Sequence, residues 1–131
     1  MAARSKARKR ALDVLFASDV RGESANDALD RAIADGDAPT NAYTVVLVRG
    51  VVEHQVAIDD LLRDASEGWS LERMPAVDRN VLRLGVFELM YADDVPDGVA
   101  VTEAMNLVRD LSTDESPAFV NGVLGTILRT R

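Results

Sequence analysis

The chain contains no cysteine and only one histidine, His54. Without cysteine it has no disulfide framework, no thiolate metal ligand and no cysteine nucleophile. A single histidine also excludes a metal site built from two imidazoles of one chain. No apolar run approaches the roughly 20 residues that span a bilayer, and no signal-type apolar stretch follows the N-terminus. We therefore expect a soluble cytoplasmic protein.

Basic residues are concentrated at the N-terminus, although the chain carries a formal net charge of −7. Five of its fifteen basic residues are Arg4, Lys6, Arg8, Lys9 and Arg10, which gives residues 1–10 a formal charge of +5. The remainder carries ten basic and twenty-two acidic side chains, a formal charge of −12. This basic arm is a candidate contact for a polyanion, because each cation that neutralises a phosphate releases counterions. The alternative is a solvated terminus that keeps the protein soluble.

The length of 131 residues and an apolar content of 47% suit one domain with its own core. Apolar residues recur with helical periodicity along most of the chain. The predicted fold class is therefore all-α, with six or seven helices. The Val-rich stretch 45–52 is also compatible with a buried strand, but the length of the surrounding periodic segment favours a helix. The predicted helices cover residues 4–20, 24–35, 41–65, 76–92, 99–111 and 117–128, with a helical turn at 70–74.

Local signals set the predicted helix ends. Ser24 with Asp27 resembles a capping pair, and Gly36 ends that helix ahead of a loop at 36–40. Thr40 or Asn41 caps the long third helix, which Gly68 closes. The side chains of that helix that are expected to face inward are Val45, Val48, Val52, Val56 and Leu62. Pro75 is expected at the first position of the next helix. Residues 95–98 are expected to form a turn, and residues 113–116 to cap the last helix.

No constellation of residues points to catalysis, a cofactor or a metal. Glu53 and His54 are adjacent, so on a helix their side chains diverge by about 100° and form no acid–base pair. The acid pairs 59–60 and 93–94 are expected to be solvated, the first on the outer side of a helix. Gly122 and Gly125 lie within a helical period, where close helix packing is the expected explanation.

Binding is the remaining class of function. The arm lies in the first turns of a helix, where Arg4, Arg8 and Lys9 can share one exposed side. Cations at a helix N-terminus oppose the macrodipole, which suggests that an anion orders the arm. Phe16, Tyr91 and Phe119 are scarce aromatic residues that stack on unpaired bases if exposed, and otherwise belong to the core. Arg79 and Arg83, four residues apart, either extend a basic track or form exposed ion pairs.

The motifs taken together resemble the NusB family of transcription antitermination factors. The matching segments occur in the family's order and cover nearly the whole chain, with residues 22–42 matching weakly. They are 4–16 (RSKARKRALDVLF), 59–62 (DDLL), 69–73 (WSLER), 77–84 (VDRNVLRL), 87–89 (FEL), 102–104 (TEA) and 116–124 (SPAFVNGVL).

The resemblance implies a single NusB-like RNA-binding domain over residues 1–131, folded as two small helical bundles, with residues 1–10 as the basic arm. It implies a non-catalytic factor that binds the single-stranded boxA element of ribosomal-operon RNA together with NusE, a ribosomal protein. It also implies assembly with NusA, NusG and RNA polymerase, and some family members form homodimers. No cofactor is implied.

Carried over to this sequence, the resemblance assigns two overlapping sets of residues. This sequence departs from the family at two positions. Leu111 stands where some relatives have an aromatic residue, so it cannot stack on a base. Ser5 interrupts the basic run, and this interruption weakens the RNA binding expected in the absence of a partner. The expected RNA-binding residues are Arg4, Lys6, Arg8, Lys9, Phe16, Asp78, Arg79, Glu115 and Phe119, and the expected partner-binding residues are Phe16, Arg83, Leu111 and Phe119.

Two other classes of function stay open at this point. The first is a helical dimerisation or protein-interaction module whose basic arm meets an acidic partner. The second is an RNA methyltransferase, because similar helical domains occur fused ahead of such enzymes. The chain has no cofactor-binding Gly loop and no Cys nucleophile, which makes the second alternative the weaker one.

Overall fold

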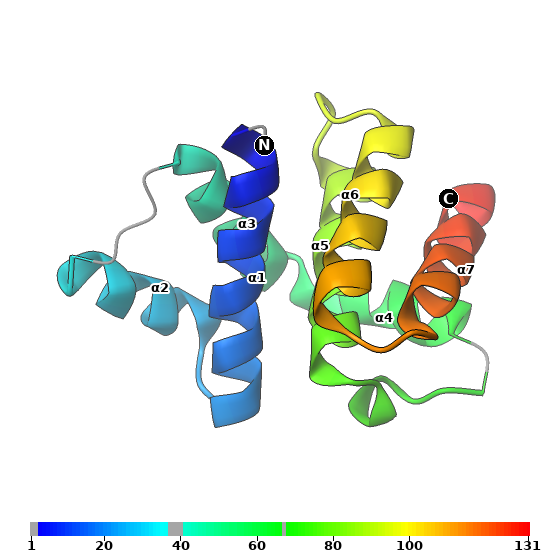
Figure 1. Ribbon diagram of the computed structural model, residues 1–131, viewed down its shortest axis with the longest axis horizontal. Coiled ribbons are helices and arrows are strands. Elements are labelled where there is room, and N and C mark those ends of the chain that lie inside the picture. Colours follow the sequence, from blue (N-terminus) through cyan, green and yellow to red (C-terminus); the bar gives the residue numbers. More distant parts are fainter. Residues whose placement is uncertain (1–2, 37–40, 67) are drawn as a thin grey trace. The chain divides into compact units, whose positions relative to one another are not determined.

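The computed structural model describes residues 3–36, 41–66 and 68–131, and these residues are helical without a strand (Figure 1). This confirms the predicted all-α class. No helix among the described residues is both long and apolar enough to cross a membrane. The elements are α1 (Ala3–Arg21), α2 (Ala25–Ala34), α3 (Ala42–Glu53), α4 (Gln55–Ala65), the 3-10 turn η1 (Leu71–Arg73), α5 (Ala76–Tyr91), α6 (Asp97–Leu111) and α7 (Ser116–Thr130).

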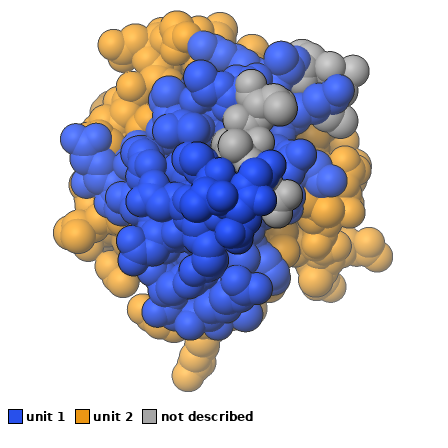
Figure 2. All heavy atoms as spheres, turned by 90° about the vertical axis from the view of Figure 1, so that its left-hand side faces the viewer, with its two compact units in different colours: residues 1–53 blue, residues 54–131 orange. Residues whose placement is uncertain are grey.

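The chain forms two compact units, which are coloured separately in Figure 2. Unit 1 comprises residues 1–53 and unit 2 residues 54–131. In unit 1, α1, α2 and α3 pack against one another. The four-residue spacing of Ala7, Ala11 and Leu15 predicts the inner face of α1, and all three side chains are buried. Leu29 from α2 and Leu47 from α3 are fully buried too, and each such Leu stabilises the bundle by about 1.5–3 kcal/mol.

The C-terminus of α1 is a Schellman motif. Gly22 has φ of 70°, in the left-handed region. Its N–H donates to the carbonyl of Asp19 at 3.2 Å, and the N–H of Glu23 donates to the carbonyl of Ser18 at 2.9 Å. These bonds satisfy carbonyl groups that would otherwise be unpaired at the end of the helix.

The predicted limits of the second helix are confirmed, but its predicted cap is not. Ser24 is the N-cap residue of α2 without a side-chain capping bond. Gly36 follows the helix with φ of 81°, as expected of a terminating glycine. The predicted loop continues into residues 37–40, which lie outside the described residues, as does the proposed Thr40 cap. Asn41 does cap α3, because its Oδ1 accepts the N–H of Tyr43 at 2.8 Å.

The prediction of one continuous helix over residues 41–65 is wrong. The helix is interrupted at His54, which separates α3 from α4 and has a non-helical ψ of 13°. The interruption shifts the phase of the buried face, so Ile58 and Leu62 are buried while Val56 is 80% exposed. The prediction that Val56 faces inward is wrong because it continued the periodicity of α3 across this break. The strand alternative for residues 45–52 is also excluded.

Unit 2 is built around α5, which packs against α4, α6 and α7. Residues 80–89 are buried without interruption, so α5 has no solvent-facing side there. Close helix packing occurs at Gly85, where an added Cβ would lie 3.2 Å from both terminal methyl groups of Leu124. The expectation that Gly122 and Gly125 serve close helix packing is wrong. A Cβ at Gly122 would meet no atom within 4 Å, and one at Gly125 would meet the side chain of Arg129 on the same helix at 3.3 Å.

Three helix starts differ by a residue or two from prediction. Pro75 is the N-cap of α5 rather than its first residue. Asp97 begins α6, so half of the predicted turn at 95–98 is helical. Ser116 begins α7 immediately before Pro117, which occupies a first-turn position where its missing N–H costs nothing.

Two glycines offer a matched test of this backbone. Gly22→Ala should lower the free energy of unfolding by about 1–2 kcal/mol, because alanine is strained at positive φ. Gly122→Ala, in an exposed position of α7, should raise it by about 0.5–1 kcal/mol through helix propensity. Urea denaturation followed by circular dichroism measures both, and destabilisation by both would contradict the assigned backbone.

Candidate nucleic-acid interface

The basic arm is part of α1, but its cations do not share one exposed side as predicted. Lys6, Lys9 and Arg10 are exposed. Arg8 is only 4% exposed, although it was expected to project with Arg4 and Lys9. Arg4 is exposed as well, although it contacts α3, so Arg8 is the buried cation of the arm and the other four are exposed.

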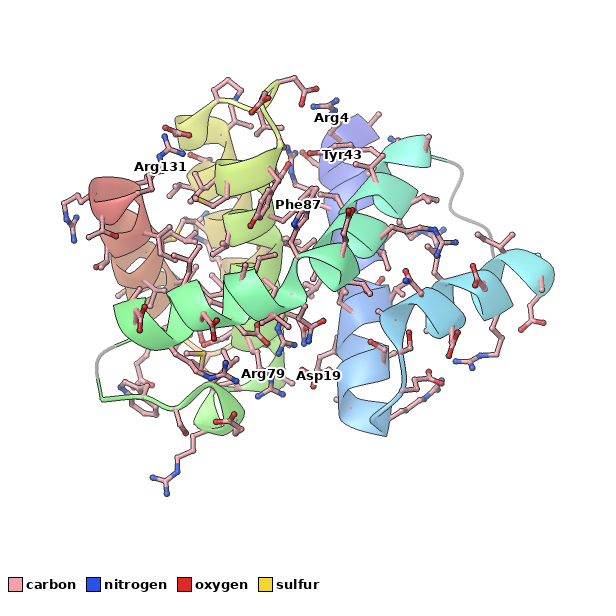
Figure 3. All side chains as sticks on the ribbon, turned by 180° about the vertical axis from the view of Figure 1, so that it is seen from behind. Arg4, Asp19, Tyr43, Arg79, Phe87 and Arg131 are labelled. Atoms are coloured by element: carbon pink, nitrogen blue, oxygen red, sulfur yellow. The ribbon has the colours of Figure 1, made fainter. Side chains whose placement is uncertain are left out.

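The arginine pair meets the ring of Tyr43, near the start of α3 (Figure 3). The guanidinium carbon of Arg4 lies 4.2 Å from the ring centroid, and that of Arg8 lies 5.7 Å away. Two hydrogen bonds flank this contact: Asn41 Nδ2 donates to the carbonyl of Ala3 at 3.0 Å, and Thr44 Oγ1 to that of Ala7 at 3.1 Å. The chain itself thus supplies an ordering contact that the sequence analysis assigned to a bound anion.

Phe16 continues the exposed side of α1. It follows Lys9 by seven residues, which places the two on the same side of the helix. Its side chain is 37% exposed, and Val20, one turn further on, is also exposed. Phe16 is therefore accessible to a base or to an apolar partner surface.

In unit 2, three predicted residues line one pocket of about 150 Å³: Asp78, Glu115 and Phe119. Trp69 forms part of the wall and is 57% exposed. Its ring meets Phe119 edge to face, with centroids 6.1 Å apart and an interplanar angle of 60°. The pocket thus presents two aromatic rings beside the exposed carboxylate of Glu115.

Asp78 lines this pocket and forms hydrogen bonds to the segment that carries its other residues. It is buried, and its carboxylate accepts hydrogen bonds from Ser112 Oγ at 2.5 Å and Ser116 Oγ at 2.8 Å. These bonds join α5 to the end of α6 and to the start of α7. Asp78 therefore fixes the segment that carries Glu115 and Phe119.

Arg83 is not an accessible partner contact. It is 9% exposed, and its Nε and Nη2 donate to the two carboxylate oxygens of Asp59 at 2.9 and 3.1 Å. Asp59 is buried too, which corrects its expected place on the outer side of a helix, whereas Asp60 is exposed. Arg79 is half-buried and donates to the carbonyls of Leu71 and Met74. Arg83 therefore forms a buried ion pair instead of an exposed one, and Arg79 is only half-buried, so the two do not form an exposed basic track along α5.

Two remaining candidates lie elsewhere in unit 2. Leu111 is exposed at the end of α6. Tyr91 is partly exposed and stacks on His54, with ring centroids 3.8 Å apart and an angle of 9°. The single histidine therefore packs as an aromatic side chain at the start of α4.

Hydrogen bonds lower the pKa of two carboxyl groups among the described residues, Glu23 and Glu72. Arg31 donates to Glu23, and this hydrogen bond lowers the pKa of the Glu23 carboxyl. A backbone hydrogen bond lowers the pKa of Glu72, with a smaller contribution from Arg63. No group of three metal-ligating side chains occurs among the described residues.

Sequence reasoning missed two residues of these surfaces. Tyr43 lies just beyond the weakly matching segment 22–42 and in none of the family motifs. Its contact with Arg4 depends on how α1 and α3 pack. Trp69 falls within a quoted motif, and a large aromatic residue between Gly68 and Ser70 in a turn is a signal of exposure.

Fold and surfaces define an all-helical binding protein with a cationic first helix. The chain matches the NusB family model over residues 5–129 and belongs to the NusB family. A protein named transcription antitermination protein NusB, from Nocardioides sp. strain JS614, is 76% identical over 131 residues, which cover 100% of this chain and 97% of that protein.

Solved structures show the same fold. A structure of T. maritima NusB superposes with a TM-score of 0.87 at 34% identity, covering 98% of this chain and 92% of that one. A crystal structure of the antitermination factors NusB and NusE in complex with double-stranded RNA gives a TM-score of 0.86 at 30% identity, covering 100% and 99%.

The buried ion pair yields a stability prediction. Arg83→Met should lower the free energy of unfolding by about 3–5 kcal/mol, because it leaves the Asp59 carboxylate buried without its partner. Arg63→Met, which removes an exposed pair with Asp60, should cost less than about 1 kcal/mol. Urea titration of both variants measures the difference, and equal losses would show that the Arg83 pair is solvated.

Proposed function

We propose that this chain is a transcription antitermination factor that binds boxA-type single-stranded RNA together with NusE and promotes antitermination in ribosomal RNA operons. The observation that carries the proposal is the row of exposed cations on α1, followed by the exposed ring of Phe16. Family membership over residues 5–129 supports it. The protein acts by binding and not by catalysis.

In this proposal α1 holds the RNA backbone. Arg4, Lys6, Lys9 and Arg10 neutralise phosphates, and Phe16 stacks on an unpaired base. Phosphate contacts fix position but carry no sequence information. The bases are read where hydrogen-bonding groups and rings lie together, and in unit 2 that place is the pocket with Glu115 and Phe119.

The structure refines the roles of the other expected residues. Asp78 is buried and supports the pocket through its two serine hydroxyl bonds. Arg79 supports the turn at η1 through the carbonyls of Leu71 and Met74. For NusE we propose the exposed side chains of Phe16 and Leu111 and the half-buried ring of Phe119. We omit Arg83 because it is buried.

The remaining partners follow from the family. We propose that residues 1–131 act as one functional domain and join NusA, NusG and RNA polymerase in an antitermination complex. The crystal structure of NusB and NusE with double-stranded RNA, to which the fold is similar, supports NusE and RNA as partners.

A second candidate function is a protein-interaction module that dimerises. Phe16 and Val20, one turn apart on α1, are both exposed apolar residues, which favours a helix-to-helix contact there. Sedimentation with and without RNA separates the two functions: a dimer that RNA does not dissociate favours the interaction module.

A salt series tests the proposed function. With boxA-like single-stranded RNA and NusE, four or five phosphate contacts predict that log K falls with log salt with a slope of about −3. Fluorescence anisotropy measures the affinity, with a scrambled RNA and a duplex of the boxA sequence as comparisons. A flat salt response, or equal affinity for scrambled RNA, would contradict the proposal.

Phe16 offers a more local test. Phe16→Ala should weaken binding of the single-stranded RNA by about 1–3 kcal/mol, because the base loses its stacking partner. The matched control is Val20→Ala, which removes an exposed apolar side chain from the same helix without removing a ring. Anisotropy titration compares them, and equal effects would show that the ring does not stack.

A further inference from the structure

A groove of about 380 Å³ lies between the end of α4 and α7 in unit 2. The two helices pack against each other (Figure 1). The rings of Trp69 and Phe119 line this groove as well as the pocket with Glu115, so the two hollows adjoin at a shared pair of rings. The other residues that line the groove are Ala65, Ser66, Ala118, Gly122, Val123 and Thr126.

The described residues that line the groove include no charged side chain. They offer a phosphate no cationic partner, and they offer a cation no carboxylate. Space is open above α7, because a Cβ at Gly122 would meet no atom within 4 Å. The indole ring of Trp69 is 57% exposed, so a flat group has access to its face. The groove therefore suits a flat, uncharged group.

Ser66 adds a polar group to this lining. Its side chain is buried, and its Oγ has no hydrogen-bond partner within the described part of the chain. The other hydroxyl of the groove is already used, because Thr126 Oγ1 donates to the carbonyl of Gly122 at 3.0 Å. A buried hydroxyl without a partner is unfavourable, so Ser66 gains from a ligand that supplies one. Rotation of the Ser66 side chain toward the groove breaks no hydrogen bond, and serine has three staggered positions.

The turn that carries Trp69 is fixed on both sides. The N–H of Trp69 donates to the carbonyl of Ser66 at 2.9 Å, and Gly68 between them has φ of 76°, in the left-handed region. The indole ring meets Phe119 edge to face. The stacking surface is thus in place before a ligand arrives, which lowers the entropy lost on binding.

We infer that this groove takes one nucleobase of the bound RNA, stacked on Trp69 with its edge hydrogen-bonded to Ser66 Oγ. The inference rests on the proposed function and adds a second base subsite to it. A nucleobase is flat and uncharged, and it carries polar atoms along its edge. It therefore matches the exposed ring, the uncharged lining and the hydroxyl. Because a hydroxyl both donates and accepts, this subsite stacks a base with little preference for its identity.

Fluorescence gives a direct test, because Trp69 is the single tryptophan of the chain. Addition of boxA-like single-stranded RNA to the protein with NusE should quench its emission, since a base covers the indole ring. NusE with RNA, without this chain, serves as the blank. A series of RNAs, each with one base removed as an abasic nucleotide, should contain one position at which the quenching is lost.

Two substitutions in the groove should weaken RNA binding in anisotropy titrations. Trp69→Ala should reduce the affinity about 5- to 150-fold, and it should abolish the effect of that one abasic position. Ser66→Ala should reduce the affinity about two- to tenfold while it raises the urea midpoint, because it removes a buried hydroxyl without a partner. These opposite signs separate a lost contact from a folding defect.

Filling the groove supplies a matched pair of variants. Gly122→Leu places a side chain in the groove and should weaken RNA binding without lowering the urea midpoint, because leucine favours a helix over glycine. Asn121→Leu adds the same side chain at an exposed neighbouring position of α7 and should leave the affinity unchanged.

The outcomes separate this inference from the proposed function. Wild-type binding that is independent of salt, or equal for scrambled RNA, would contradict both. Salt- and sequence-dependent binding with unchanged Trp69 emission, or with unchanged affinity of Trp69→Ala or Ser66→Ala, would overturn the inference alone. Quenching by NusE without RNA would assign the groove to the partner protein and would also overturn it.

Discussion

Unit 2 depends on the burial of α5, which leaves its polar side chains no access to water and therefore requires partners for them within the protein. Arg83 meets this requirement through Asp59 on α4, and Asp78 through Ser112 and Ser116. These two sets of bonds join α5 to α4, α6 and α7. The pocket that carries Phe119 is a consequence, because the start of α7 is held where Asp78 can reach it.

In unit 1 the corresponding constraint is charge rather than burial. The first turns of α1 carry cations where the helix dipole disfavours them. The aromatic face of Tyr43 on α3 contacts Arg4, and hydrogen bonds from Asn41 and Thr44 to backbone carbonyls of α1 hold this end of the helix against α3. Arg8 is buried by this arrangement, while Lys6 and Lys9 stay exposed. The arm therefore combines fixed guanidinium groups with freely solvated ammonium groups.

Periodicity and turn signals predict the helical class and most helix limits, because these depend on local sequence. The break at His54 escapes them, since the segment is periodic on both sides and the interruption changes only the phase, as Val56 shows. The same distinction between local sequence and tertiary packing applies to the site residues. The family resemblance assigns Glu115 and Phe119 to the candidate site. Whether Arg83 faces solvent instead depends on tertiary packing against Asp59, a partner 24 residues away.

In the proposed function, such packing also decides which residues are accessible to RNA. A buried, bidentate arginine such as Arg83 keeps its position whether or not a ligand is present, so it adds no selectivity. In that proposal, the exposed lysines on α1 contribute affinity for any phosphate chain and lose it with added salt. Discrimination among RNA sequences then rests on groups that are accessible and held rigidly. The exposed ring of Trp69 packs edge to face against the half-buried Phe119, whose helix is tied to Asp78 through Ser116, so this pair is our candidate for that role in unit 2.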